Sequence, residues 1–264
     1  METLKNKKCF LLDMDGTIYL GNQLIDGALD FLNTLKTRDI NYIFLTNNSS
    51  KNRANYVEKL KSMGYIARED EIFTSGEATA IYLNNIKRGA KIYLMGTPQL
   101  EEEFIDAGFH LVRGRDDNPD AVVLGFDTTL TYEKIWIGCD YIRSGVKFIA
   151  THPDFNCPLE GDRYMPDTGS MIRLFEASTG VSPMVIGKPN TYIIDAIMDK
   201  YGFKKEDLVM VGDRLYTDIK VGENAGITSV LVLSGETTIE DYECSETKAD
   251  YVFPSIKELA NLLK

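Results

Sequence analysis

Short apolar runs alternate with longer amphipathic stretches along this 264-residue chain. The runs are continuous rather than interrupted by polar residues, which is typical of parallel strands covered on both faces. Alternation of such strands with helices predicts an α/β fold built on a mainly parallel sheet. The predicted strands lie at residues 9–13, 42–46, 91–95, 121–126, 147–151, 184–187, 208–213, 229–234 and 249–253.

Helices are predicted where apolar residues recur three and four positions apart. This spacing is found in the stretches 28–35, 56–63 and 193–201. Gly64 and Gly202 follow two of these stretches, and glycine in that position is a common helix stop. A closing helix is predicted over residues 254–264, with Pro254 at its start.

Composition and charge narrow the classes of function. Hydrophobic residues make up 44% of the chain, which is ordinary for a globular protein, and the net charge of −11 disfavours nucleic acids and anionic lipids. We therefore predict no nucleic-acid polymer as a partner and no membrane association. Four scattered cysteines, no apolar run near the ~20 residues of a membrane span and no signal-peptide pattern predict a cytoplasmic protein.

Chemically capable residues follow four of the apolar runs. Asp13 ends the first run and Asp15 follows it, Thr46 ends the second, Lys188 follows the sixth, and Asp213 ends the seventh. At any single run, a polar residue that merely ends a strand is the simpler interpretation. Because ligands of open parallel sheets bind beyond the carboxyl ends of the strands, we expect the four ends to converge on one site.

The types of these residues indicate phosphoryl transfer. Carboxylates brought together repel one another unless a cation is present, and oxygen ligands with little histidine favour Mg²⁺. A carboxylate can also act as a nucleophile and form an aspartyl phosphate. The hydroxyl of Thr46 and the positive charge of Lys188 suit phosphoryl oxygens.

The order of these motifs resembles that of the haloacid dehalogenase-like hydrolases. The resemblance rests on Asp13-Met14-Asp15-Gly16-Thr17, then Thr46, Lys188 and the string GDRLYTD at 212–218, and it extends from residue 9 to about residue 233. The longer strings DMDGTIYLG and GDRLYTD resemble the NagD-like phosphatase branch. This resemblance implies a Rossmann-like, doubly wound parallel core with an inserted α/β cap of the kind that this branch carries.

The resemblance also implies roles for the acidic residues. Asp13 would be the nucleophile, and Asp15 would be the general acid that later becomes the general base. Mg²⁺ would be bound by the carboxylates of Asp13 and Asp213 and by the backbone carbonyl of Asp15. Asp218 would support the metal and orient the lysine.

Three further residues would bind the phosphoryl group by the same resemblance. These are Thr46, the backbone N–H of Asn47, and Lys188, which would balance the charge of nucleophile and phosphate.

The spacing of the motifs predicts the second domain. Thr46 and Lys188 are 142 positions apart, which is far more than a helix, a strand and their loops require. We therefore expect a catalytic core formed by residues 1–77 and 184–264 and an inserted α/β cap formed by residues 78–183. The resemblance suggests a cap-mediated homodimer as well.

The cap is expected to set the choice of substrate. The candidate residues are His152, Asp154, Asp167 and Thr168. His152 stands where the family's T-N-P-D stretch has asparagine, and Asp167 and Thr168 stand where small residues are common. A hydrogen-bonded loop residue is the alternative interpretation of His152.

These observations predict an Mg²⁺-dependent phosphatase for small phosphorylated metabolites such as nucleoside monophosphates, sugar phosphates or aryl esters resembling p-nitrophenyl phosphate. Two alternatives stay open at this point: a phosphotransferase or mutase of the same superfamily, and a non-catalytic protein that binds phosphoesters. Mutases usually carry their cap between the first two motifs, where this chain has room for only a hairpin at about residues 18–25 and one helix. Binding alone requires no second aspartate.

Overall fold

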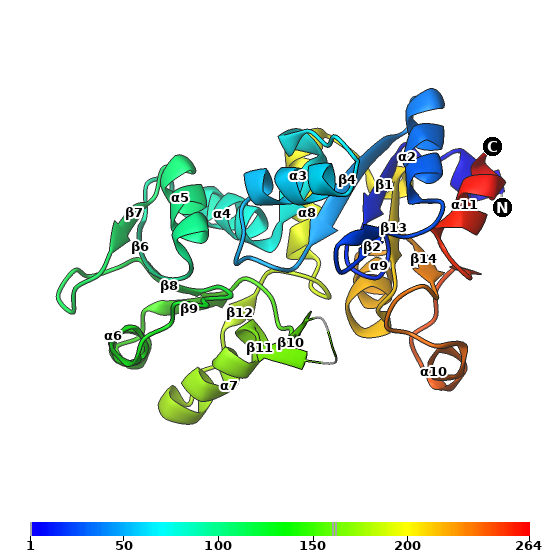
Figure 1. The fold of residues 1–264 in the computed structure, drawn as a ribbon. Coiled ribbons are helices and arrows are strands. Elements are labelled where there is room, and N and C mark those ends of the chain that lie inside the picture. The colour runs from blue at the N-terminus through cyan, green and yellow to red at the C-terminus, as the bar shows by residue number, and fades with distance from the viewer. Residues whose placement is uncertain (1, 160, 162) are drawn as a thin grey trace. The chain divides into compact units, whose positions relative to one another are not determined.

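The chain forms two compact units in this computed structural model, which describes residues 2–159, 161 and 163–264 (Figure 1). The first unit comprises Met1–Thr46, Arg53–Phe73 and Lys188–Lys264, and the second comprises Asn47–Asn52 and Thr74–Gly187. The second unit thus starts at residue 74 rather than 78, ends at 187 rather than 183, and includes a short segment after Thr46.

The first unit is built on a six-stranded sheet with the order β15-β14-β13-β1-β4-β5. The pairs β13–β1, β1–β4, β13–β14 and β14–β15 are parallel. The chain adds strands outward from β1 first on one side and then on the other, so the order reverses between β1 and β13. The strands are β1 (Cys9–Leu12), β4 (Asn41–Thr46), β5 (Ile72–Thr74), β13 (Leu208–Gly212), β14 (Thr228–Val232) and β15 (Tyr251–Phe253).

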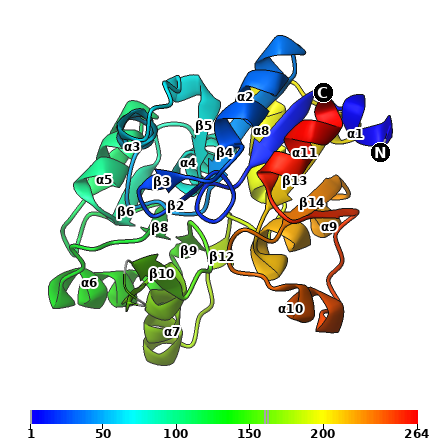
Figure 2. The same cartoon turned by 45° about the vertical axis from the view of Figure 1, so that its right-hand side comes forward.

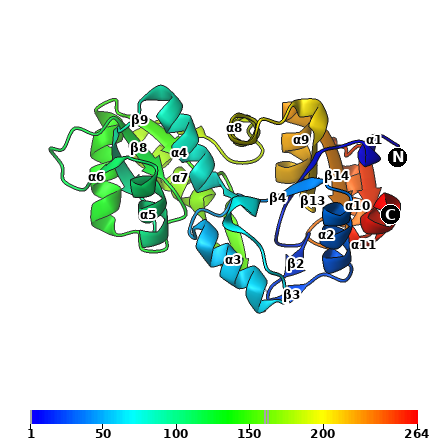
Figure 3. The same ribbon diagram turned by 90° about the horizontal axis from the view of Figure 1, so that it is seen from above.

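Helices cover both faces of this sheet. Strands β4, β13 and β14 run between α9 on one side and α2 with α11 on the other (Figure 3), and α2 and α11 pack against each other (Figure 2). The α-helices are α1 (Glu2–Lys5), α2 (Ala28–Thr37), α3 (Arg53–Ser62), α8 (Tyr192–Tyr201), α9 (Lys220–Ala225), α10 (Ile239–Cys244) and α11 (Ile256–Leu263). Smaller elements are the hairpin β2 (Tyr19–Leu20) and β3 (Gln23–Leu24), the 3₁₀ turns Glu69–Glu71 and Lys205–Asp207, and the π-helical turn Leu215–Ile219.

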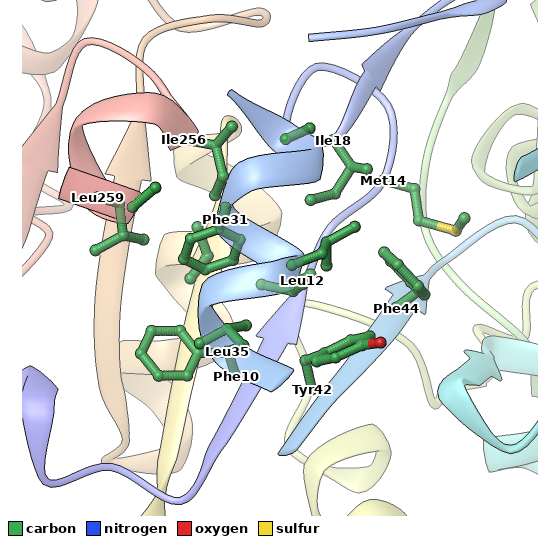
Figure 4. Close-up of a cluster of buried hydrophobic side chains, with 14 of the residues drawn as sticks. Phe10, Leu12, Met14, Ile18, Phe31, Leu35, Tyr42, Phe44, Ile256 and Leu259 are labelled. Atoms are coloured by element: carbon green, nitrogen blue, oxygen red, sulfur yellow. The ribbon is translucent and has the colours of Figure 1, made fainter. Parts of the chain in front are cut away.

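One hydrophobic core lies between the sheet and the face formed by α2, α3 and α11. Alternate residues of each strand point into it, because side chains switch faces at every position of a strand. Figure 4 shows the packing of Phe10 and Leu12 from β1 against Phe31 and Leu35 from α2. The rings of Phe10 and Phe31 meet edge to face at 5.9 Å. This packing fixes β1, and with it the position of the residues that follow Leu12.

The second unit has its own parallel sheet with the order β12-β9-β8-β6-β7. Helices α6 and α7 cover one face and α4 and α5 lie on the other (Figure 1). The strands are β6 (Lys91–Met95), β7 (His110–Val112), β8 (Ala121–Leu124), β9 (Lys147–Ala150) and β12 (Met184–Val185), with the antiparallel pair β10 (Asn156–Leu159) and β11 (Arg163–Pro166). The helices are α4 (Ser75–Ile86), α5 (Pro98–Asp106), α6 (Tyr132–Arg143) and α7 (Thr168–Thr179).

The α/β fold predicted from the apolar runs is confirmed, and each of the nine runs contains a strand. The run at 184–187 differs in its place, because Met184 and Val185 pair with Ile149 and Ala150 of the second sheet. The closing helix starts at Ile256 rather than Pro254, since the Ser255 hydroxyl accepts a hydrogen bond from the N–H of Lys257 and thereby caps it. Gly202 ends α8 in a left-handed conformation, as predicted.

In the described part of the chain, no helix is both long enough and apolar enough to cross a membrane.

Candidate active site

The candidate site lies in the first unit, where β1, β4 and β13 end side by side. Asp13 directly follows β1, Thr46 is the last residue of β4, and Asp213 directly follows β13. The N–H of Asp13 donates to the carbonyl of Val211 (2.9 Å), which continues the parallel pairing one residue past the strand. The reversal of strand order between β1 and β13 is the position where open parallel sheets bind ligands.

Lys188 joins two of the acidic residues. Its Nζ donates to Asp13 Oδ1 (2.6 Å), to Asp218 Oδ1 (2.7 Å) and to the carbonyl of Leu45 (3.3 Å). The lysine is 2% exposed, and a buried ammonium is stable only when it is paired. Lys188 is the first residue of its segment in this unit, so the chain brings it to the sheet without a core strand of its own.

A tight turn after β13 aims Asp218 at the lysine. The residues Leu215–Ile219 form a π-helical turn, and Asp218 Oδ2 accepts from the N–H of Arg214 (3.1 Å). A side chain at Gly212 would collide with Asp218, so the close approach of this turn to the strand requires glycine.

Asp213 is held by a segment that follows β14, the next strand of the sheet. The N–H of Glu236 donates to Asp213 Oδ2 (2.7 Å), and the side chain of Glu236 pairs with Arg214 Nε (2.8 Å). A Cβ at Gly235 would lie 2.7 Å from the Cβ of Asp213. This segment was not among the predicted site residues. The run at 229–234 also ends in a polar residue, Ser234, so the rule applied to the other strands could have pointed to it.

Asp15 projects from a turn that leads into the hairpin. Gly16 has φ +86°, and its N–H donates to the carbonyl of Tyr19 (2.8 Å). Lys59 of α3 places its Nζ 3.9 Å from the centre of the Tyr19 ring. Burial raises the pKa of Asp15, although the charges of Lys59 and Arg214 act in the opposite direction. A raised pKa suits a carboxyl group that must carry a proton near neutral pH.

The carboxylates next to Lys188 hold an excess of negative charge. Among the described residues, one oxygen from each of Asp13, Asp213 and Asp218 lies within 4.8 Å of the others. Burial and then repulsion from Asp218 raise the pKa of Asp13 to about 7, although Lys188 and Arg214 oppose the rise. Burial and the charges of Asp13 and Asp218 also raise the pKa of Asp213. Burial alone would lower the pKa of Lys188, but the two aspartates outweigh it and the pKa is raised.

This cluster suits a hard divalent cation. When ionised, the three carboxylates exceed the single ammonium of Lys188 by two negative charges. All of the candidate side-chain ligands are carboxylates, the donors that Mg²⁺ prefers. Asp15 contributes no carboxylate to the cluster. The residue types and their spacing therefore fit a magnesium ion.

The remaining predicted residues lie in the second unit. Asn47, the residue after Thr46, donates from Nδ2 to Asp154 Oδ1 (3.1 Å). His152 is fully buried and its Nε2 lies 2.9 Å from Asp167 Oδ1. Asp167 caps helix α7 by accepting from the N–H of Thr168 (2.5 Å). His152, Asp167 and Thr168 are thus buried within a hydrogen-bonded network, and Asp154 is partly exposed beside Asn47.

Comparisons with known proteins give a consistent result. A family model described as haloacid dehalogenase-like hydrolase matches residues 10–110, and a second, HAD-hydrolase-like, matches residues 185–259. An acid sugar phosphatase from Staphylococcus epidermidis is 38% identical over 253 residues, covering 96% of this chain and 96% of that protein.

Solved structures match nearly the whole of this chain. The 4-nitrophenylphosphatase from Thermotoga maritima is 50% identical with a TM-score of 0.93, and the match covers 99% of both chains. A glycerol phosphate phosphatase from Mycobacterium tuberculosis, solved in complex with magnesium, is 30% identical with a TM-score of 0.88 and matches 96% of this chain and 77% of that one.

Proposed function

We propose a mechanism from the premise that this chain belongs to the haloacid dehalogenase-like hydrolases, in the NagD-like branch, and is a phosphatase of small phosphate monoesters. In this mechanism the enzyme acts through an aspartyl phosphate on Asp13. The observation that carries the proposal is the buried Lys188, which bridges Asp13 and Asp218 at the point where the strand order reverses. The bridge orients one oxygen of Asp13 and leaves the other available for attack.

In the first step, the free oxygen of Asp13 forms a bond to phosphorus and the bond between phosphorus and the ester oxygen breaks. Asp15 gives its proton to the leaving alkoxide, so the alcohol departs neutral. In the second step Asp15 takes a proton from water, the water oxygen bonds to phosphorus, and the bond from phosphorus to Asp13 breaks. Inorganic phosphate is released and both aspartates return to their starting states.

We assign phosphoryl binding to Thr46, Lys188 and the N–H of Asn47. Thr46 ends the strand next to β1, and Lys188 contacts the nucleophile directly. Asn47 follows Thr46 in the chain. Hydroxyl, ammonium and backbone N–H groups are the donors that stabilise charge on a transferring phosphoryl group.

The acidic cluster would hold Mg²⁺ through the carboxylates of Asp13 and Asp213 and the backbone carbonyl of Asp15, with Asp218 in support. When bound, the ion would neutralise carboxylate charge and draw electron density from the phosphoryl oxygens. The 234–236 segment keeps the Asp213 carboxylate in place through the N–H of Glu236. A phosphatase relative solved with magnesium supports this choice of metal.

We further propose that the second unit is the cap that selects the leaving group. It contains a complete sheet with helices on both faces, and it includes Asn47 and Asp154. Relatives named for sugar phosphate, nitrophenyl phosphate and glycerol phosphate point to sugar and aryl phosphates as the first esters to test. A homodimer and a cytoplasmic location stay predictions.

Release of inorganic phosphate from a panel of such esters, with Mg²⁺ and with a chelator, tests the proposal. We expect Asp13→Asn to abolish turnover and Asp15→Asn to slow either alcohol release or hydrolysis of the phosphoenzyme in single-turnover kinetics. Asp30→Asn, on the exposed surface of α2, is the matched control and should behave as the wild type. Full turnover by Asp13→Asn, or without any divalent metal, would refute the mechanism.

A further inference from the structure

His152 has both ring nitrogens bonded inside the second unit. Nε2 lies 2.9 Å from Asp167 Oδ1, and Nδ1 lies 2.9 Å from the hydroxyl of Thr151. The whole side chain is buried. Because the imidazole is buried, it can affect the substrate only through the groups to which it is hydrogen-bonded.

The donor and the acceptor of each hydrogen bond in this network can be assigned. Asp167 Oδ1 also accepts from the N–H and the hydroxyl of Thr168, so as a carboxylate it acts as an acceptor, and Nε2 of His152 carries the hydrogen. Nδ1 is then an acceptor, and the Thr151 hydroxyl must donate to it.

The same order continues to the loop that follows Thr46. Because the Thr151 hydroxyl donates to His152, it must accept from Ser49, whose oxygen lies 2.9 Å away. Ser49 in turn accepts from the backbone N–H of Phe126 (2.9 Å). In this order Ser49 uses its single hydrogen on Thr151 and keeps a lone pair for the N–H of Phe126. The neutral Nε2–H form therefore satisfies every group in the chain.

The network meets Asn47 at its backbone and its side chain. The Ser75 hydroxyl donates to the carbonyl of Asn47, and Ser75 Oγ packs 3.5 Å from Nδ1 of His152 without a hydrogen to share with it. Asp154, two residues after the histidine, accepts from the amide of Asn47 (3.1 and 3.3 Å). A Cβ at Gly187 would lie 2.7 Å from Asn47 Oδ1, so the surroundings leave Asn47 little freedom.

We propose that His152 is a positioning residue: held by Asp167, it acts through Thr151 and Ser49 to fix the loop 47–52, and so orients Asn47 for the phosphoryl group. His152 therefore governs affinity for the part that all substrates share, not the choice among leaving groups. The inference rests on the proposed function, because it takes the phosphoryl-binding role of Asn47 from it.

Two kinetic quantities separate this role from direct contact with the leaving group. A positioning residue changes the inhibition constant of inorganic phosphate and kcat/KM for every ester by a similar factor. A residue that contacts the leaving group changes the ratio of kcat/KM between esters and leaves phosphate inhibition unaltered. A residue that only stabilises the fold lowers Tm and changes neither quantity for the folded enzyme.

The experiment compares His152→Ala with wild type on p-nitrophenyl phosphate, glycerol phosphate and a sugar phosphate, with inorganic phosphate as the inhibitor. Loss of about one effective hydrogen bond should raise the phosphate inhibition constant about fivefold and lower kcat/KM for all three esters alike. His110→Ala is the matched control, because His110 is the other histidine of the chain and is exposed on β7. An unchanged inhibition constant, or a changed ratio between esters, would overturn the proposal.

A second variant and a spectrum keep the test decisive if His152→Ala does not fold. Thr151→Val removes the hydroxyl that joins His152 to Ser49 and should raise the phosphate inhibition constant by a similar factor; an unchanged constant contradicts the proposal. The imidazole ¹⁵N spectrum, with two histidines to assign, should show His152 as the Nε2–H form at neutral pH, and the Nδ1–H form contradicts it. Failure of the proposed function is recognised separately, since wild type would then show no Asp13-dependent turnover.

Discussion

Gly235→Ala tests whether the 234–236 segment controls the metal site. The new Cβ would lie 2.7 Å from the Cβ of Asp213 and closer still to its carboxylate, whereas carbon atoms in contact normally stay about 3.5–4.0 Å apart. The segment or the carboxylate must therefore move by about 1 Å. Gly235 does not have a positive φ, so alanine adds a collision without backbone strain.

The magnitude follows from what the movement breaks. Overpacking costs about 1–3 kcal/mol, and the hydrogen bond from the Glu236 N–H to the charged Asp213 (2.7 Å) contributes about 1.5–3 kcal/mol. Groups that orient a metal ligand typically change affinity about 10- to 100-fold when they are lost. We expect Mg²⁺ to bind Gly235→Ala weaker by a factor in this range.

Calorimetric titration of the apoprotein with Mg²⁺ measures this affinity, and the concentration of Mg²⁺ that gives half-maximal turnover provides a second value. Gly202→Ala is the matched control. Its added Cβ meets open space, but its φ of +76° strains an alanine, so it loses stability far from the site. If Gly235→Ala folds and binds Mg²⁺ as tightly as Gly202→Ala does, the reasoning about this segment is wrong.

Two further predictions concern charge in the first unit. Lys188→Met leaves Asp13 and Asp218 buried without their cation. We expect the free energy of unfolding in urea to fall by about 3–5 kcal/mol and kcat/KM to fall at least about 100-fold. The double variant Lys188→Met with Asp218→Asn should recover stability but not turnover. The pKa of Asp13 is raised from 3.8 to about 7 in the folded protein without metal, so the folded state binds this proton more tightly than the unfolded chain does. The contribution of Asp13 to stability therefore falls as the pH rises from about 4 to about 7. In urea unfolding with a chelator, the free energy of unfolding of Asp13→Asn should exceed that of wild type by an amount that grows across this pH window to about 4 kcal/mol at most. A difference that does not depend on pH would contradict the raised pKa.

Much of the site could be predicted from the sequence because its residues directly follow buried strands. Asp13, Thr46 and Asp213 each stand at the end of an apolar run, and parallel strands bring such ends together at one edge of the sheet. Lys188 was predicted by the same rule, but the strand that precedes it, Met184–Val185, belongs to the second sheet. The end of that strand is therefore not what places Lys188. The lysine is placed by its two carboxylate partners.

The contacts that hold these residues could not be predicted, because they join distant parts of the chain. Glu236 holds Asp213 across 23 positions, and Ser75 holds Asn47 across 28. The role of His152 was equally hidden, since the sequence does not show that both of its nitrogens are bonded. Loop-to-loop hydrogen bonds have no periodicity, and periodicity is what makes strands and helices readable.

The sequence by itself determined the α/β class, the order of the chemical motifs and the residues that end the strands of the core. These features depend on local patterns of apolar residues and on which residue follows each strand. The tertiary structure decided that Asn47 and the strand at 184–185 belong with the inserted unit, that Asp213 is held by the 234–236 segment, and that His152 is buried between Thr151 and Asp167. Those outcomes depend on which segments pack together, because a buried polar group must find its partner wherever the fold places one.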